Sequence, residues 1–167
     1  MKKNKVYIIA EIGINHEGSL YNAKKLIRAA KRAGADAVKF QVFEPETLAR
    51  DGLNKTKQQQ RYTKNNLSLT KMWKKMYLSF RQLKKLEKIS KKLKIDFICS
   101  VFDEKSLKKV KKLNLKFIKI ASSEINNHYL LNLIKKSKKK IILSTGLADE
   151  KEISEKLKIL GKKIYVL

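Results

Sequence analysis

The sequence has little cysteine, proline or acidic charge, and no long hydrophobic run. Its single cysteine, Cys99, excludes an internal disulfide and a metal cage of cysteines. Cys99 lies in the apolar run FICS, which predicts a buried, inert thiol. No apolar stretch approaches the roughly 20 residues of a membrane-spanning helix. The run near the N-terminus ends at Glu11, too soon for a signal peptide, so we expect a cytoplasmic protein.

Acidic residues number 15 against 41 lysines and arginines, which gives a net charge of +26. Such an excess suggests nucleic acid or another anionic partner. However, the basic residues are mostly lysines scattered over all the expected helices, without a basic arm or an arginine-aromatic block. We therefore favour lysine-rich solvent faces over nucleic-acid binding, although the positive field would still attract anionic substrates.

Short apolar runs alternate with amphipathic segments along the 167 residues. The apolar runs predict six strands, at 6–10, 36–43, 95–100, 115–121, 140–144 and 163–167. The amphipathic segments predict five helices between them, at 19–33, 79–93, 103–113, 127–137 and 149–160. A long polar stretch, 44–67, contains the only proline and predicts a lid, a binding loop or disorder. A short helical piece is expected at 70–77.

This alternation predicts a parallel sheet with right-handed crossovers, either in a (β/α)₈ barrel or in a doubly wound sheet. The motifs GxGxxG and GxxxxGK[ST] are missing, which argues against the nucleotide-binding folds. A complete barrel needs eight strands and typically about 250 residues. We therefore predict an α/β fold of the TIM (β/α)₈ type, truncated to about six strands and five helices.

Polar residues stand out at the C-terminal ends of five predicted strands. In the stretch FIKIASSEINN, residues 117–127, Lys119 interrupts an apolar run and a polar cluster follows. A barrel would bring all five strand ends together on one rim. Lysines and serines there can bind phosphate or carboxylate, and glutamates can transfer protons. The residues in question are Glu11, Lys39, Gln41, Ser100, Lys119, Ser122, Glu124 and Ser144.

Each of these residues also has a simpler explanation when it is taken alone. A lysine in a strand can extend to solvent, and a serine at a strand end often caps the next helix. Glu124 can interact with the dipole of the following helix. We expect His16 at the surface and His128 in the first turn of a helix, with no metal-ligand partner nearby in sequence. Only the occurrence of the whole set at successive strand ends favours a shared site.

Five motifs carry a family resemblance, and they occur in the order IIAEIGINHEGS, VKFQ, FICSVFD, FIKIASSEINN and IILSTG. In them the chain resembles the sialic acid (N-acetylneuraminate) synthase family, of NeuB type, over nearly its whole length. The resemblance implies a (β/α)₈ barrel followed by a small antifreeze-like (SAF) domain. It also implies a homodimeric transferase of carbohydrate biosynthesis. Such enzymes condense phosphoenolpyruvate with an N-acetylated amino sugar to a nonulosonate, using Mn²⁺ or Mg²⁺.

The resemblance also assigns roles to residues. Glu11 and Gln41 match positions that hold the sugar acceptor, and Glu124 matches an acidic residue near the reacting carbons. Glu11 and Glu124 are thus the predicted catalytic pair. The implied chemistry is attack of the enol C3 on the open-chain aldehyde, addition of water at C2, and loss of phosphate by C–O cleavage. The positions that match phosphoenolpyruvate ligands are Lys39, Ser100, Lys119, Ser122 and Ser144. Ser100 keeps a hydroxyl where the family often has threonine.

The family's metal-binding histidines follow the sixth strand, and neither His16 nor His128 matches them. We therefore predict no metal site within this chain. We expect residues 1–167 to be a partial barrel domain without the C-terminal strands and the SAF domain. Such a fragment should bind phosphoenolpyruvate weakly and be inactive alone.

Two other functions stay open at this point. One is a Schiff-base aldolase on the same barrel, with Lys119 as the nucleophile. The other is a non-catalytic basic module that binds RNA or DNA with a steep salt dependence. The series of motifs favours the synthase over both, and the sequence does not identify the sugar.

Overall fold

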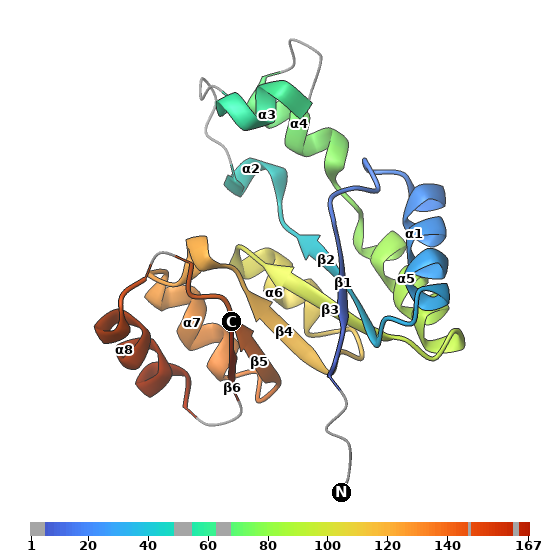
Figure 1. Ribbon diagram of the computed structural model, residues 1–167. Helices are drawn as coiled ribbons and strands as arrows, with labels where there is room; N and C mark the ends of the chain where they lie inside the picture. The colour runs from blue at the N-terminus through green and yellow to red at the C-terminus, as the bar shows by residue number, and fades with distance from the viewer. Residues whose placement is uncertain (1–5, 49–54, 63–67, 147, 162–163) are drawn as a thin grey trace, which may run out of the picture.

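The computed structural model describes residues 6–48, 55–62, 68–146, 148–161 and 164–167. Its centre is a six-stranded parallel sheet whose strands follow one another in chain order (Figure 1). A doubly wound sheet reverses its strand order at a switch point, whereas a barrel keeps it. The order therefore confirms the barrel prediction. The strands are β1 (Ile9–Gly13), β2 (Ala37–Val42), β3 (Asp96–Val101), β4 (Phe117–Ile120), β5 (Lys140–Leu143) and β6 (Ile164–Val166).

Five helices cover the outside of the curved sheet, as the amphipathic segments predict (Figure 1). They are α1 (Leu20–Arg32), α5 (Phe80–Lys92), α6 (Glu104–Val110), α7 (His128–Lys135) and α8 (Glu150–Leu160). Each begins after a side chain that accepts a hydrogen bond from a backbone N–H of the first turn, which fixes where the helix starts. These capping residues are Ser19, Ser79, Asp103, Asn127 and Asp149. None of the described helices has the length and apolar character needed to cross a bilayer.

The polar stretch 44–67 contains more regular structure than the sequence predicts. Two short helices form there, α2 (Pro45–Leu48) and α3 (Lys57–Tyr62), and the predicted helix at 70–77 appears as α4 (Leu69–Met76). The only proline begins α2, a position where its missing N–H does no harm. Asp103 holds this turn from outside, because its carboxylate accepts hydrogen bonds from the Glu44 N–H at 3.0 Å and the Thr47 hydroxyl at 3.2 Å. Residues 49–54 and 63–67 of the stretch lie outside the described residues.

The main core lies between the sheet and the five helices. Alternate residues of each strand, such as Phe40 and Ile118, pack there against helix residues such as Leu86 and Leu131. Cys99 belongs to this layer and is fully buried, which confirms the prediction of a buried thiol. Burial raises the pKa of that thiol, so it stays protonated. The inner face of the sheet, turned away from the helices, holds a smaller apolar cluster, Ala37, Ile98, Phe117 and Ile142.

The two histidines behave differently from each other. His128 begins α7, as predicted, and its Nε2 lies 3.2 Å from the Nζ of Lys156 on α8. Lys156 is also more completely buried than Ile153 and Leu157, two apolar residues of α8 that pack against the core.

The prediction that His16 lies at the surface is wrong, because the loop after β1 folds back over the core and leaves this side chain only 1% exposed. Its Nδ1 accepts a hydrogen bond from the Gly18 N–H at 3.0 Å, and its ring stacks on Phe40 with centroids 5.8 Å apart. Its Nε2 makes no hydrogen bond within the described residues. Burial lowers the pKa of His16 to about 4.

This buried imidazole predicts a loss of stability in acid. Between the unfolded pKa of 6.5 and the folded pKa of about 4, only the unfolded chain binds the proton. The contribution of His16 is therefore complete above pH 6.5 and is lost as the pH falls towards 4. The loss should reach up to about 3 kcal/mol, because one pKa unit corresponds to about 1.4 kcal/mol.

Urea unfolding between pH 7 and pH 4 measures this dependence. The control is His16→Gln, which keeps an acceptor for Gly18 but does not titrate. The free energy of unfolding of the wild type should fall more steeply than that of the variant below pH 6.5. Parallel pH profiles for the two proteins would contradict this role of His16.

Candidate active site

The inner face of the sheet carries two successive layers of side chains. Because side chains alternate along a strand, each apolar residue near a strand's start is followed two positions later by another inward side chain. Ala37 is followed by Lys39, Phe117 by Lys119, and so on across the sheet. The parallel register sets Glu11 beside Lys39 and Ser100 beside Lys119. The second layer, nearer the C-terminal ends of the strands, is therefore polar.

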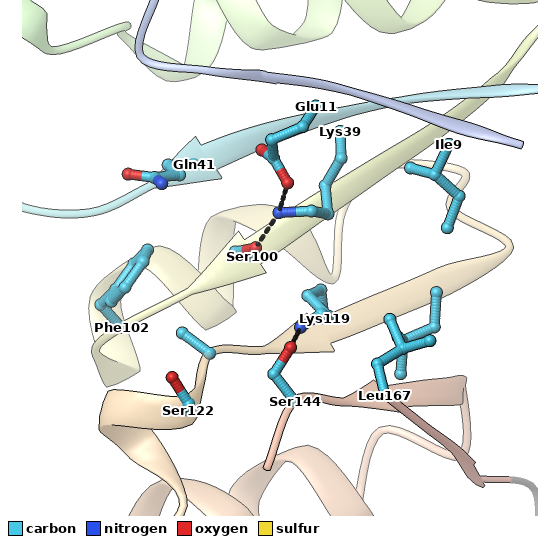
Figure 2. Close-up of a pocket in the computed structure, with 12 residues that line it drawn as sticks. Ile9, Glu11, Lys39, Gln41, Ser100, Phe102, Lys119, Ser122, Ser144 and Leu167 are labelled. Atoms are coloured by element: carbon cyan, nitrogen blue, oxygen red, sulfur yellow. Dashed lines mark hydrogen bonds and ion pairs between the residues drawn. The ribbon is translucent and has the colours of Figure 1, made fainter. Parts of the chain in front are cut away.

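The polar layer lines one cavity of about 360 Å³, whose lining residues are shown in Figure 2. The amino groups of Lys39 and Lys119 both point into it (Figure 2). All the predicted site residues except Glu124 line this cavity, namely Glu11, Lys39, Gln41, Ser100, Lys119, Ser122 and Ser144. The five strand ends thus converge on one space, as expected for neighbouring strands of a barrel.

Lys39 is held by an ion pair with Glu11 and donates a hydrogen bond to the Ser100 hydroxyl at 3.1 Å. The pairing of β1 with β2 shifts register between Glu11 and Gly13, which is the mark of a bulge. Gly13 has φ 55, and a Cβ added to it would lie 3.4 Å from a carboxylate oxygen of Glu11 and 3.8 Å from the amide nitrogen of Gln41. Both distances are ordinary van der Waals contacts, so the positive φ, and not a lack of space, is what favours glycine beside these two side chains.

Lys119 is the buried cation of the site, with 6% of its surface exposed. Its Nζ donates hydrogen bonds to the Ser144 hydroxyl and, at 3.3 Å, to the Ile120 carbonyl. Burial, and secondarily the charge of Lys39, lowers the pKa of Lys119 to about 8, although Glu11 acts in the opposite direction. No ion pair joins Lys119 to any carboxylate of the described residues. The lining therefore has two amino groups and one carboxylate, an arrangement that favours an anionic ligand.

Glu124 is the one predicted site residue that the structure leaves outside the lining. It ends a short 3₁₀ turn, η1 (Ser122–Glu124), that begins with a lining residue. Its carboxylate accepts hydrogen bonds from the Asn127 amide at 2.9 Å and the Ser123 hydroxyl at 3.2 Å. Glu124 is thus tied to the start of α7, next to the cavity.

The cavity also has apolar lining residues, which were not among the predicted site residues because all of those are polar. Phe102 forms part of the wall, as do Ile9, Ala121, Ile142 and Leu167. Most of them lie two positions from a predicted residue: Phe102 follows Ser100, and Ala121 follows Lys119. Strand alternation alone could therefore have found them.

A divalent metal does not fit the part of the cavity that the structure describes. No three His, Cys, Asp or Glu side chains lie close enough to hold an ion there. Glu11, the carboxylate of the lining, is already paired with Lys39. Neither His16 nor His128 lines the cavity, since one packs on Phe40 and the other lies beside Lys156. We therefore assign no chemical step to a metal.

The model of the NeuB family matches residues 26–167 of the chain. The N,N'-diacetyllegionaminic acid synthase of Campylobacter jejuni is 43% identical over 158 residues, which are 95% of this chain and 47% of the relative. The enzyme of the same name from Legionella pneumophila is 40% identical over 151 residues, or 88% of this chain and 41% of the relative. The chain therefore spans about half the length of these curated relatives.

Among solved structures, the chain resembles the N-acetylneuraminic acid (sialic acid) synthetase from Leptospira borgpetersenii, crystallised in complex with citrate. The TM-score is 0.84 at 30% sequence identity, and the match covers 98% of this chain and 53% of that one. The likeness thus extends over the whole described sheet and its helices.

The low pKa of Lys119 predicts that anion binding takes up protons. At pH 8 about half of the Lys119 amino groups are neutral, and a nearby anion raises the pKa of a lysine. Sulfate does not titrate near this pH, so its binding should take up about half a proton at pH 8 and close to none at pH 6. Calorimetry in buffers of different ionisation enthalpy measures this uptake.

Lys119→Arg is the matched control, because arginine remains charged at both values of pH. Its sulfate binding should be free of proton uptake. Equal uptake by the variant and the wild type would show that another group takes the proton.

Proposed function

This chain belongs to the NeuB family, and on that premise we propose that it carries the anion-binding half of a nonulosonate synthase. The reaction condenses phosphoenolpyruvate with an N-acetylated amino sugar and releases phosphate. The observation that carries the proposal is the convergence of Lys39, Lys119 and three serine hydroxyls on one cavity. Phosphoenolpyruvate offers a phosphate and a carboxylate, and charge-assisted hydrogen bonds are the strongest contacts available to such groups.

In the proposed reaction, C3 of phosphoenolpyruvate attacks the aldehyde carbon of the open-chain sugar and forms the new C–C bond. The aldehyde oxygen takes up a proton. Water then adds at C2, and phosphate leaves by cleavage of its C–O bond. Lys119 and Lys39 lie among the Ser100, Ser122 and Ser144 hydroxyls and would balance the ligand's negative charge throughout. A preorganised positive pocket is suited to a reaction whose substrate and leaving group are both anions.

We assign the two glutamates to the acceptor side of the reaction. Glu11 and Gln41 flank Gly13 at one end of the cavity and would hold the sugar hydroxyls. Glu11 also forms an ion pair with Lys39, and the ammonium group of Lys39 would be the proton donor within its reach. Glu124 is proposed as the second proton-transfer group, and its position in the same short turn as the lining residue Ser122 supports this role. The Asn127 amide donates a hydrogen bond to its carboxylate and would hold that group in position.

The rest of the site is proposed to come from polypeptide that corresponds to the other half of the relatives. Within the described residues, β1 pairs only with β2 and β6 only with β5. Ile9 of β1 and Leu167 beyond β6 nevertheless line the same cavity, so further strands between these edges would complete its wall. We propose that the completed protein is a cytoplasmic homodimer whose Mn²⁺ or Mg²⁺ ligands and SAF domain lie in that half. Residues 1–167 alone would then bind phosphoenolpyruvate without turning it over.

A Schiff-base aldolase is the second candidate, and the buried Lys119 with its pKa of about 8 favours it. An aldolase needs one neutral lysine, whereas this cavity has a second lysine, Lys39, and hydroxyls around both. That arrangement and the family favour the synthase. Borohydride trapping with pyruvate distinguishes the two, because a stable adduct on Lys119 would support the aldolase.

Phosphoenolpyruvate binding tests the proposal directly. Lys39→Ala and Lys119→Ala should each weaken binding by about tenfold or more, because each removes a charged donor facing the ligand. Calorimetry or NMR titration measures the affinity. Lys84→Ala is the control, since Lys84 is exposed on α5 and away from the cavity. Losses of equal size in all three variants, or in none, would contradict the assignment.

A further inference from the structure

The loop after β5 packs very tightly against the polar turn after β4. Gly146, two residues beyond Ser144, is the residue at the contact. A Cβ added to Gly146 would lie 2.5 Å from the Cβ of Ser122 and 2.9 Å from its hydroxyl oxygen. Carbon atoms that are not bonded do not approach so closely. Only a hydrogen fits between the Gly146 backbone and the Ser122 side chain.

We propose that Gly146 is a positioning residue that fixes the Ser122 hydroxyl in the anion-binding cavity. The inference rests on the proposed function, because it treats Ser122 as a ligand of the anion. Ser122 stands in a single 3₁₀ turn and is exposed, so the turn alone gives its side chain little support. The contact with Gly146 supplies that support from the neighbouring strand.

The same strand end therefore controls two hydroxyls of the cavity. Ser144 is tied to β4 by its N–H, which donates to the Ile120 carbonyl at 3.1 Å, and its hydroxyl accepts from Lys119. Two residues later, Gly146 sets the side chain of Ser122. A small shift of this loop would move one hydroxyl relative to the other, and hydrogen bonds to an anion weaken steeply with misalignment.

A glycine at this position has a second explanation, because Gly146 has φ 54, a conformation that L-residues rarely adopt. Gly34 is a control that distinguishes the steric explanation from the backbone explanation. It has φ 85 at the end of α1, but a Cβ added there would meet nothing within 4 Å. Gly34→Ala thus imposes backbone strain without a steric contact and far from the cavity lining, whereas Gly146→Ala imposes both.

The test measures the affinity for inorganic phosphate by NMR titration, with unfolding curves recorded for every variant. Gly146→Ala should weaken phosphate binding by about tenfold, which corresponds to the loss of one hydrogen bond to an anion. Gly34→Ala should lose stability but keep the wild-type affinity. If Gly146→Ala binds phosphate as the wild type does, the inference is overturned while the proposed function stands.

A double-mutant cycle tests whether Gly146 acts through Ser122. Ser122→Gly removes the atoms that an alanine at 146 would meet, so adding Gly146→Ala to it should cost no further affinity. A further loss of similar size would show a general distortion of the loop and overturn the inference. Should Gly146→Ala alone not fold, the double variant, in which the contact is relieved, is still compared with Ser122→Gly.

The two failures are distinguishable in one set of titrations. If the wild type does not bind phosphate, or if Lys119→Ala binds it as the wild type does, the proposed function and this inference are both overturned. Binding that depends on Lys119 but not on Gly146 would overturn the inference alone.

Discussion

The buried ammonium group of Lys119 is the constraint on which the site depends. It lies on the inner face of the sheet with 6% exposure, and the carboxylate of the lining, Glu11, is already paired with Lys39. Burying a charge without a counter-ion costs free energy, and an apolar residue of similar size would suit stability better. The lowered pKa of Lys119 reflects the same unfavourable environment. A cation kept under these conditions is best explained by an anionic ligand that offsets the cost when it binds.

The helix-facing core holds the charges in place. Lys39 stands between Val38 and Phe40, both fully buried under the helices, and Lys119 stands between two buried isoleucines. Because side chains alternate along a strand, neighbours packed on one face leave the lysine only the other face. The barrel-like order of the strands then brings both lysines to one cavity. The same apolar packing that stabilises the sheet therefore forces two like charges into one space.

Much of this arrangement follows from local sequence pattern. Strand alternation, and the position of Lys119 at the end of an apolar run, predict both the barrel and the shared cavity. The failures depend on tertiary contacts that leave no periodic signal. The burial of His16 requires its loop to fold back onto Phe40, and α2 is too short to be stable without the bonds from Asp103. Phe102 was not predicted because the predicted site residues were chosen as polar side chains at strand ends. An apolar residue in the wall of the site does not meet that criterion.

The most direct test of the shared cavity is heteronuclear NMR of the lysine side chains during addition of inorganic phosphate. Lysine-to-arginine variants at positions 39 and 119 assign the two signals. The structure predicts that the Lys39 and Lys119 signals shift along one saturation curve, while those of exposed lysines follow only the weak, linear effect of ionic strength. Two different saturation curves, or shifts no larger than those of the exposed lysines, would show that the two amino groups do not share an anion site.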